Sequence, residues 1–256
     1  MRTSLAAQLQ QGINFRDLGG LVMQDGRRIR PNCLFRSGAL NELSDADLAL
    51  LATLPDAAVI DYRDRRESDL HPDRLWATAR YYPVAANPHG AQVSASLDTL
   101  VGEAMENFDA DAFMRELYTL LPFNNPAYQQ LAALLRDPHT PTIIQHCAVG
   151  KDRTGIGVAL VLFALGATYD TVLQDYLLTQ NALAPFRDRL LTRFHDRLNA
   201  QARAKLLVVL SVQPDCLRAA LDEIIRRYAT PAAWLAEEYQ LDAAACARLR
   251  DRFLEG

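Results

Sequence analysis

The chain has 256 residues, which suits one large domain or two small ones, and half of these residues are apolar. Its formal charge of −4 argues against nucleic acid as the main partner, because proteins that track phosphate backbones usually carry a basic stripe. The four cysteines lie far apart without a CxxC pair, so neither a disulfide framework nor a zinc cluster is indicated. A small anionic substrate and a reducing compartment remain compatible with these values.

No segment indicates a membrane span or a secretory leader. The N-terminal MRTSLAAQLQQG lacks the apolar core and the cleavage pattern of a signal peptide. The longest apolar run, GIGVALVLFALGA from Gly155, is shorter than the roughly 20 residues that a membrane span needs, and it predicts a buried helix instead. We therefore expect a soluble, cytoplasmic protein, with export by a route without a signal peptide left open.

In chain order, the patterns predict a hairpin and then alternating strands and helices. The run LVMQDGRRI at 21–29 carries an Asp-Gly turn typical of a hairpin. Short apolar runs indicate strands at 33–36, 57–60, 81–85 and 141–145. Ser44 is expected to cap a helix over 45–54, with Asp47 where a strict capping box has Glu or Gln. This order predicts a single α/β domain over 1–256, with a mainly parallel sheet flanked by helices and a helical C-terminal half.

The loop after the last predicted strand, QHCAVGKDRTG at 145–155, combines one thiol with two cations and leads into the apolar helix. In open parallel sheets, loops at the carboxyl ends of strands lead to helix N-termini, whose free N–H groups bind anions. A Walker A nucleotide loop is excluded, because Gln145 and Asp152 stand where that motif has Gly and Ser or Thr. The loop therefore predicts a phosphate site of another kind.

The spacing of Cys147 and Arg153 is weak evidence by itself, because Cys246 and Arg252 repeat it. That second copy has no preceding strand and no glycine, and it lies in a helical pattern. Around Cys147, a strand precedes the loop, Gly150 lies within it and a helix follows. The context therefore selects Cys147 as the functional thiol.

This loop has the groups that a phosphoryl site needs. Its backbone N–H groups can form a nest around three oxygens, so we expect phosphate to contact Ala148, Val149, Gly150, Lys151, Asp152 and Arg153. The planar guanidinium of Arg153 can hold two oxygens, which places Cys147 in line with phosphorus. A helix N-terminus and adjacent cations lower the pKa of such a thiol. Thr154 is expected to donate to the sulfur and His146 to brace the loop; helix capping and strand-end packing are their alternative roles.

The segment HCAVGKDRTG resembles the signature loop of cysteine-dependent protein tyrosine phosphatases, most closely a bacterial subgroup with HCxxGKDRTG. Further segments are similar to that subgroup: NFRDLGG at 14–20, LFRSGAL at 34–40, VIDYRDRRE at 59–67 and the C-terminal LRAALDEIIRRYATPAAWLAEEYQL. The resemblance implies the cysteine-phosphatase fold, a phosphocysteine intermediate, Cys147 as nucleophile, Arg153 as phosphate ligand, and neither metal nor cofactor. Lys151 and Asp152 are the characteristic loop pair of the subgroup, whereas Tyr62 departs from its usual leucine.

For the group that protonates the leaving oxygen, the sequence offers more than one candidate. Asp61 ends a strand expected to lie parallel to the strand before Cys147, and Asp152 lies within the loop itself. These two carboxyls are equal candidates for the catalytic acid, with Asp98 or His89 as a third candidate.

Other charged residues are expected to serve the fold. The alternative role of Asp61 is a buried ion pair with Arg16 or Arg36, and these two arginines with Asp17 are expected to form a charged layer that supports the loop. The run that follows Asp61 is expected to be a solvated face rather than a docking site: Arg63, Asp64, Arg65, Arg66 and Glu67.

The stretch 186–210 carries Leu190, Phe194 and Leu198 at helical spacing. These residues belong either to ordinary core or to a helical lid over the site, within an insertion of approximately 186–230.

Together the motifs predict a metal-independent phosphomonoesterase that acts on phosphotyrosine in proteins. A phosphoinositide phosphatase is the alternative in the same class. Lys151, one of two lysines in an arginine-rich chain, either pairs with a carboxyl such as Asp152 or meets a second phosphate. A rhodanese-like sulfurtransferase is disfavoured because its anion loop typically lacks the Arg-Thr-Gly helix entry. A catalytically inactive phosphopeptide-binding module is disfavoured because nucleophile, arginine and candidate acids are all present. The sequence does not indicate the oligomeric state.

Overall fold

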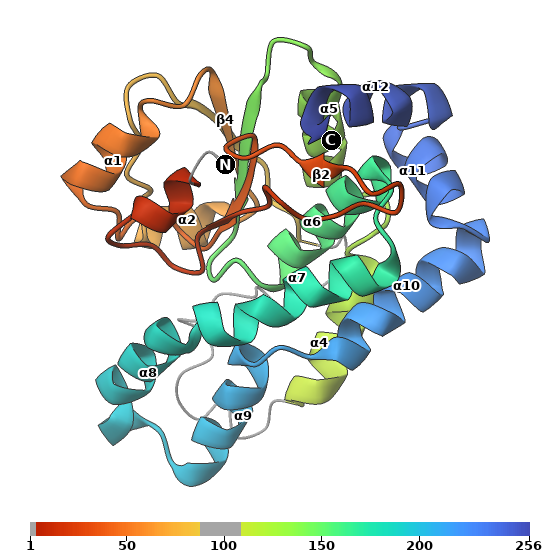
Figure 1. Ribbon diagram of the computed structural model, residues 1–256. Coiled ribbons are helices and arrows are strands. Elements are labelled where there is room, and N and C mark those ends of the chain that lie inside the picture. The colour runs from red at the N-terminus through yellow and green to blue at the C-terminus, as the bar shows by residue number, and fades with distance from the viewer. Residues whose placement is uncertain (1–3, 88–108) are drawn as a thin grey trace.

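The computed structural model describes residues 4–87 and 109–256 (Figure 1). A five-stranded sheet lies at its centre, in the spatial order β1 (Arg16–Asp17), β3 (Leu34–Ser37), β6 (Thr142–His146), β4 (Ala57–Asp61) and β5 (Arg80–Pro83). The last four strands are mutually parallel, and β1 is antiparallel to β3. The predicted α/β fold with a mainly parallel sheet is confirmed, and the four predicted strands match β3 to β6 within two residues at each end.

Alternate residues of the central strands enter two separate cores. On β4, Ala58 and Ile60 belong to a large cluster with α5 and α6, whereas Val59 faces a smaller cluster that includes Leu51 of α1. A parallel strand that is buried on both faces reads as a continuous apolar run. This explains why AAVI and PTIIQ show no polar alternation.

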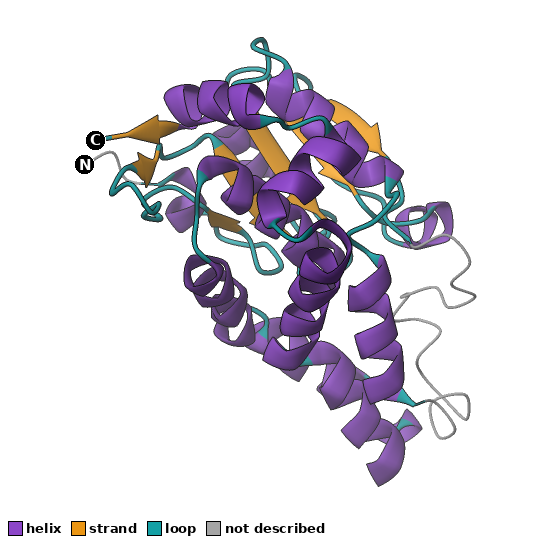
Figure 2. Cartoon of the chain, turned by 90° about the vertical axis from the view of Figure 1, so that its right-hand side faces the viewer, coloured by secondary structure: helices purple, strands orange, loops and turns teal. Residues whose placement is uncertain are grey.

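Helices cover the sheet and continue beyond it (Figure 2). Their bounds are α1 Asp45–Leu51, α2 Arg65–Leu70, α4 Ala110–Leu120, α5 Pro126–Arg136, α6 Asp152–Leu165, α7 Tyr169–Ala182, α8 Ala184–Arg193, α9 Ala200–Leu210, α10 Pro214–Tyr228, α11 Pro231–Tyr239 and α12 Ala243–Phe253, with 3₁₀ turns η1 Leu5–Gln8 and η3 His195–Arg197. The predicted helical C-terminal half is confirmed. Among the described helices, none is long and apolar enough to cross a membrane.

Local signals act as the sequence indicates. Ser44 Oγ accepts from Asp47 N at 3.1 Å, and the Asp47 carboxylate accepts from Ser44 N at 2.9 Å, so aspartate completes the capping box of α1. The hairpin at 21–29 is confirmed by the antiparallel bridge between Val22 and Arg28. Its second arm contains β2 (Arg28–Ile29), which pairs with β7 (Leu254–Glu255) near the C-terminus.

The apolar run from Gly155 forms the buried helix α6, as predicted. Gly157 allows this helix to approach the sheet, because a Cβ there would lie 2.4 Å from Gln145 Oε1 and 2.7 Å from Tyr62 Oη. Those two groups are themselves joined, since Tyr62 Oη donates to Gln145 Oε1 at 3.0 Å. The tyrosine that departs from the subgroup pattern therefore ties the end of β4 to β6.

Candidate active site

The loop that carries Cys147 runs from the carboxyl end of β6 into α6. Since β6 lies between β3 and β4, the loops after both neighbouring strands flank it. Register places His146 opposite Ser37 on one side and Asp61 on the other. The expectation that Asp61 and Cys147 share one edge of the sheet is confirmed.

The carbonyl groups of this loop are held from outside. Ala148 O accepts from Ala39 N at 3.0 Å. The amide nitrogen of Asn14 donates to Val149 O at 3.1 Å and to Gly150 O at 2.8 Å. In a trans peptide the N–H group points opposite to the carbonyl. Turning these three carbonyls outward therefore turns the following N–H groups inward, as an anion nest requires.

Gly150 is indispensable to this conformation. Its φ is +67°, a region that side chains rarely adopt, and a Cβ would lie 2.4 Å from the backbone oxygen of Ser37. The loop and the end of β3 thus touch backbone to backbone. Arg36 strengthens the contact, because its Nη2 donates to Gly150 O at 2.7 Å.

The charged layer expected from Arg16 and Arg36 is present, and it is centred on Asp175 of α7. Arg36 forms an ion pair with Asp175, and Arg16 Nε reaches the same carboxylate at 3.1 Å. Arg16 also donates to Asn14 Oδ1, which joins this layer to the loop. Burial disfavours the charged carboxylate, but the two arginines outweigh it and lower the pKa of Asp175. Asp17 instead supports the adjacent turn, since it accepts from Gly19 N at 2.8 Å.

Cys147 has the environment of a reactive thiol, although it is 2% exposed. Burial favours the neutral thiol, but the charge of Arg153, followed by the neighbouring Thr154, outweighs it and lowers the pKa of Cys147. Among the described residues, Oγ1 of Thr154 is buried and makes no hydrogen bond, so its predicted donation to the sulfur stays a prediction.

The second cysteine–arginine pair behaves as the chance copy that was predicted. Cys246 lies within α12, its thiol donates to Leu241 O at 3.3 Å, and burial raises its pKa. Arg252 donates to the carbonyls of Leu135 and Asp137 at 2.9 and 2.7 Å.

Glu67 holds Arg153, which the sequence interpretation missed. Arg153 Nη1 donates to Glu67 Oε2 at 2.6 Å and Nη2 to Oε1 at 2.8 Å. This end-on pair leaves the Nε side of the guanidinium for a phosphate. The prediction of a solvated face was wrong here, because Arg63 and Glu67 are each 3% exposed. Glu67 forms a capping box with Asp64 at the start of α2, and that DxxE spacing directly after a strand was the available signal.

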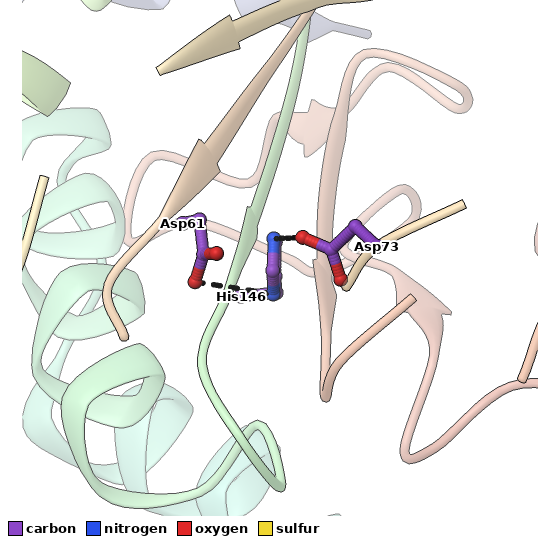
Figure 3. A group of neighbouring side chains, drawn as sticks. All are labelled: Asp61, Asp73 and His146. Carbon is purple, nitrogen blue, oxygen red and sulfur yellow. Dashed lines mark ion pairs between the residues drawn. The ribbon is translucent and has the colours of Figure 1, made fainter. Parts of the chain in front are cut away.

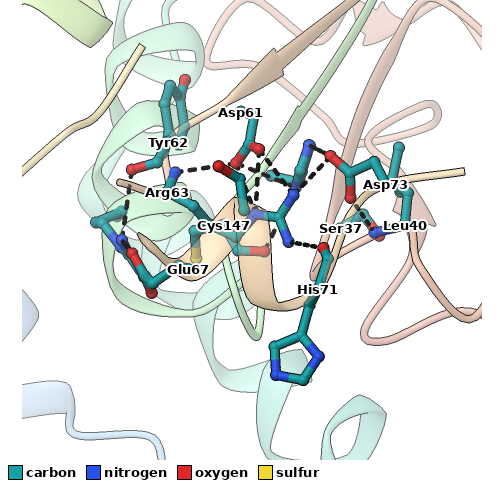
Figure 4. A network of polar contacts seen from close by, with 12 residues as sticks. Ser37, Leu40, Asp61, Tyr62, Arg63, Glu67, His71, Asp73 and Cys147 are labelled. Carbon is teal, nitrogen blue, oxygen red and sulfur yellow. Dashed lines mark hydrogen bonds and ion pairs between the residues drawn. The ribbon is translucent and has the colours of Figure 1, made fainter. Parts of the chain in front are cut away.

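Beneath the loop lies a buried network of Asp61, Arg63, Asp73 and His146 (Figures 3 and 4). Arg63 Nη2 lies 2.8 Å from Asp61 Oδ2 and 2.7 Å from Asp73 Oδ2. Imidazole nitrogens of His146 lie 3.8 Å from Asp61 and 3.2 Å from Asp73. The predicted ion pair of Asp61 exists, but its partner is Arg63 rather than Arg16 or Arg36. Arg63 is two residues from Asp61, within the run that was expected to be solvated.

Charges in this network are mutually stabilised. Burial opposes ionisation of Asp61, but His146 and the hydrogen bonds and charge of Arg63 outweigh it and lower its pKa to about 2. Burial also disfavours the imidazolium, yet Asp61 and Asp73 outweigh it and raise the pKa of His146. Asp61, Asp73 and His146 lie close enough together to ligate a metal ion, but the guanidinium of Arg63 already supplies a cation between the two carboxylates. We therefore interpret them as a bracing network in which His146 supports the loop from behind.

Asp152, the first residue of α6, has partners outside this network. Its Oδ1 accepts from Lys151 Nζ at 2.5 Å and from Tyr118 Oη at 2.8 Å. Asp152 lines a cavity of about 20 Å³ together with Cys147 and Arg153. The other candidate acids, Asp98 and His89, lie outside the described residues.

Apolar helices close the site. Phe113, Met114 and Leu117 of α4 and Val209 and Leu210 of α9 complete the wall of the small cavity. A second cavity, of about 140 Å³, also borders Ala148, and its lining includes four residues of the α8 segment: Phe186, Leu190, Arg193 and Phe194.

The helices α8 and α9, at the lower left of Figure 1, share an apolar cluster with Val149 of the loop. By contrast, α10 contributes Cys216, Leu217, Ala220 and Ile224 to the main core. Within the predicted 186–230 insertion, the part up to residue 210 therefore lies against the loop and the C-terminal part belongs to the main core, while the lid itself stays a prediction.

Comparison with known proteins agrees with this geometry. A family model described as the tyrosine phosphatase family matches residues 7–255, and the chain belongs to this family of phosphatases. It is 33% identical to a protein of Cupriavidus necator named as a tyrosine-protein phosphatase, over 95% of this chain and 86% of that protein. It is 30% identical to the triple specificity protein phosphatase PtpB of Mycobacterium tuberculosis, over 87% of this chain and 90% of PtpB. A tyrosine-protein phosphatase of Nostoc commune is 26% identical, over 60% of this chain and 51% of that protein.

Proposed function

We propose that this phosphatase hydrolyses phosphotyrosine in proteins through a phosphocysteine intermediate and without a metal. The observation that carries the proposal is the loop around Cys147, with outward carbonyls and with Arg153 held end-on by Glu67. The N–H groups of such a loop can bind three phosphoryl oxygens, and the same loop favours the thiolate form of its cysteine.

In the first step, the thiolate of Cys147 attacks phosphorus while Nε and Nη2 of Arg153 bind two phosphoryl oxygens. The bond from phosphorus to the leaving oxygen breaks, and Asp152 donates a proton to that oxygen. In the second step, the Asp152 carboxylate takes a proton from water as the water oxygen bonds to phosphorus. The sulfur–phosphorus bond then breaks and its electron pair returns to Cys147.

Asp152 suits the acid role better than Asp61. Both oxygens of Asp61 accept hydrogen bonds from Arg63, and its pKa of about 2 leaves it without a proton near neutrality. Asp152 lines the cavity beside Cys147 and has one oxygen bound by Lys151 and Tyr118. Asp152→Asn should therefore slow hydrolysis of an alkyl phosphate far more than that of an activated aryl phosphate. Asp61→Asn should affect both substrates equally.

The α8–α9 segment, residues 184–210, is our candidate for the lid. A cavity of about 20 Å³ has room for about one water molecule, so a phosphotyrosine side chain enters only when a wall moves. Replacing Val209 by alanine should ease that movement and raise kcat/KM for a bulky aryl phosphate. An unchanged kcat/KM would argue that α9 is fixed core.

Lys151 bears on the choice between protein and lipid substrates. Its ammonium is buried and paired with Asp152 at 2.5 Å, which favours the alternative in which it holds a carboxyl rather than a second phosphate. PtpB is named for triple specificity, so a panel of phosphopeptides and phosphoinositides is the appropriate substrate test. A reducing compartment such as the cytoplasm suits the proposed chemistry, because the nucleophile must stay a free thiol and all four cysteines are free.

The direct test is Cys147→Ser, which should abolish hydrolysis of p-nitrophenyl phosphate and of a phosphotyrosine peptide. Cys246→Ser is the matched control, because it changes a buried cysteine with the same spacing to an arginine and should leave the rate unchanged. Vanadate should inhibit and a chelator should have no effect. Loss of activity on chelation would overturn the metal-free mechanism.

A further inference from the structure

The two oxygens of Asp152 are in different environments. Lys151 Nζ and Tyr118 Oη both donate to Oδ1, at 2.5 and 2.8 Å. Within the described parts of the chain, no hydrogen bond reaches Oδ2. The side chain lines the cavity that contains Cys147. One oxygen is thus bound by the protein, and the other remains for what enters the cavity.

Tyr118 belongs to a chain of hydrogen bonds whose direction can be assigned. The hydroxyls of Tyr118 and Tyr176 lie 2.6 Å apart, and Gln213 N donates to Tyr176 Oη at 3.2 Å. A carboxylate only accepts, so the single proton of Tyr118 is committed to Asp152. Tyr176 must then donate to Tyr118. Every donor in the series Gln213, Tyr176 and Tyr118 therefore points toward Oδ1, and such bonds reinforce one another.

Both phenols are well placed to hold this arrangement. Tyr118 and Tyr176 are 0% and 1% exposed, and their rings meet edge to face with centroids 6.2 Å apart. Burial, followed by the negative charge of Asp152, raises the pKa of Tyr118 well above its ordinary value, so this hydroxyl keeps its proton at neutral pH. It acts as a fixed donor and does not titrate.

We propose that Tyr118, backed by Tyr176, is a positioning residue that holds Asp152 through Oδ1 and so directs Oδ2 to the leaving group. The inference rests on the proposed acid role of Asp152. With Oδ1 occupied by two donors, the acidic proton resides on Oδ2. It passes from there to the leaving oxygen as the oxygen–phosphorus bond breaks. The resulting carboxylate keeps the bonds from Tyr118 and Lys151, and Oδ2 then accepts the proton of the hydrolytic water.

The helices that carry Tyr118 and Tyr176, α4 and α7, also contribute residues to other parts of the site. Leu117 beside Tyr118 on α4 lines the cavity, and Asp175 beside Tyr176 on α7 holds Arg36 and Arg16. The side chain of Asp152 is thus held, through Tyr118 and Tyr176, by the same two helices that line the cavity and support the phosphate loop.

The test compares Tyr118→Phe, Asp152→Asn and the double variant on an alkyl phosphate and on p-nitrophenyl phosphate. Tyr239→Phe is the matched control, since it removes a buried phenol hydroxyl that donates to Pro122 O at 2.6 Å in the same core. A hydrogen bond to a charged group is worth a factor of about 10 to 150, and Lys151 remains, so we expect about a tenfold loss with Tyr118→Phe. The loss should fall on kcat for the alkyl phosphate, with KM unchanged and p-nitrophenyl phosphate hydrolysis nearly unaffected. Tyr176→Phe should have the same selectivity with a smaller loss.

The double variant separates the two levels of the proposal. If Tyr118 acts through Asp152, Tyr118→Phe should cost nothing further in the Asp152→Asn background. Equal losses on both substrates, or additive losses in the double variant, would show that Tyr118 only supports the fold. If Asp152→Asn itself shows no selectivity for the alkyl phosphate, the acid assignment fails, whatever Tyr118→Phe does.

Discussion

Asn14 offers a sharp test of how the phosphate loop is held, because one isosteric substitution removes its donors. In Asn14→Asp the side chain keeps its size but can no longer donate to Val149 O and Gly150 O. Gly150 O keeps its bond from Arg36, whereas Val149 O loses its side-chain donor. A buried acceptor without a partner costs about 1–3 kcal/mol, and the second lost bond costs about 1 kcal/mol.

The new carboxylate gains attraction to Arg16, which offsets part of this cost. We therefore expect a net loss of about 2–3 kcal/mol in the free energy of unfolding, or a Tm lower by about 5–10 °C for a chain of this size. Vanadate affinity should fall about tenfold, because the N–H groups of the loop are no longer held inward. Thermal unfolding followed by circular dichroism and the vanadate inhibition constant measure the two effects.

Asn32→Asp is the matched control. Asn32 also has a left-handed backbone, with φ of 65° against 54° at Asn14, but its side chain accepts a bond from Leu5 N at 2.8 Å. Aspartate can accept that bond equally well, so Asn32→Asp should change neither Tm nor vanadate affinity. If Asn14→Asp behaves like this control, the loop does not depend on the Asn14 donors, and our account of its geometry is wrong.

Three further outcomes follow from the site. Glu67→Gln should raise the vanadate inhibition constant about tenfold, because Arg153 loses the carboxylate that fixes its guanidinium; an unchanged constant would assign Glu67 to helix capping alone. Asp61 has its pKa lowered from 3.8 to about 2, so its ionisation contributes about 2 kcal/mol of stability that is present above pH 4 and lost as pH falls toward 2. The stability advantage of the wild type over Asp61→Asn, measured by urea unfolding, should therefore shrink across that range, and a constant difference would contradict the ion pair. Lys151→Met should slow hydrolysis of a phosphotyrosine peptide and a phosphoinositide in parallel, and a loss confined to the lipid would favour the phosphoinositide phosphatase.

Much of the fold could be predicted from the sequence, because the patterns that indicate its strands and helices involve neighbouring residues. Four strands of four or five residues, of which β3, β4 and β6 are buried, stand out as short apolar runs, and they match β3 to β6. The helix entry after Gly150 and the chance nature of the Cys246 copy could also be predicted, since both depend on neighbouring residues. The two-residue strand Arg16–Asp17 could not, because two residues establish no period.

The misses concern charges that meet through space. Glu67 lies 86 residues before Arg153, and in the sequence it looks like the end of an exposed charged run. Only the fold reveals that the first turn of α2 faces the guanidinium. Asp175 and Asp73 were not singled out at all, because an isolated aspartate in a helical or loop segment carries no signal of its partners. The two equal candidates for the acid could likewise be distinguished only when the partners of each carboxyl were known.

The contacts that hold the phosphate loop have a consequence for how the reactive thiol forms during folding. Asn14 and Arg36 reach the loop across 136 and 114 residues of chain. Contacts of such long range form late in folding, because the entropy of closing the intervening loop must be overcome first. Until then the loop does not hold Arg153 against Cys147, so the pKa of Cys147 is that of an ordinary thiol. A chain still emerging from the ribosome therefore carries a cysteine that oxidants and electrophiles attack slowly, and the reactive nucleophile arises only when the tertiary structure is complete.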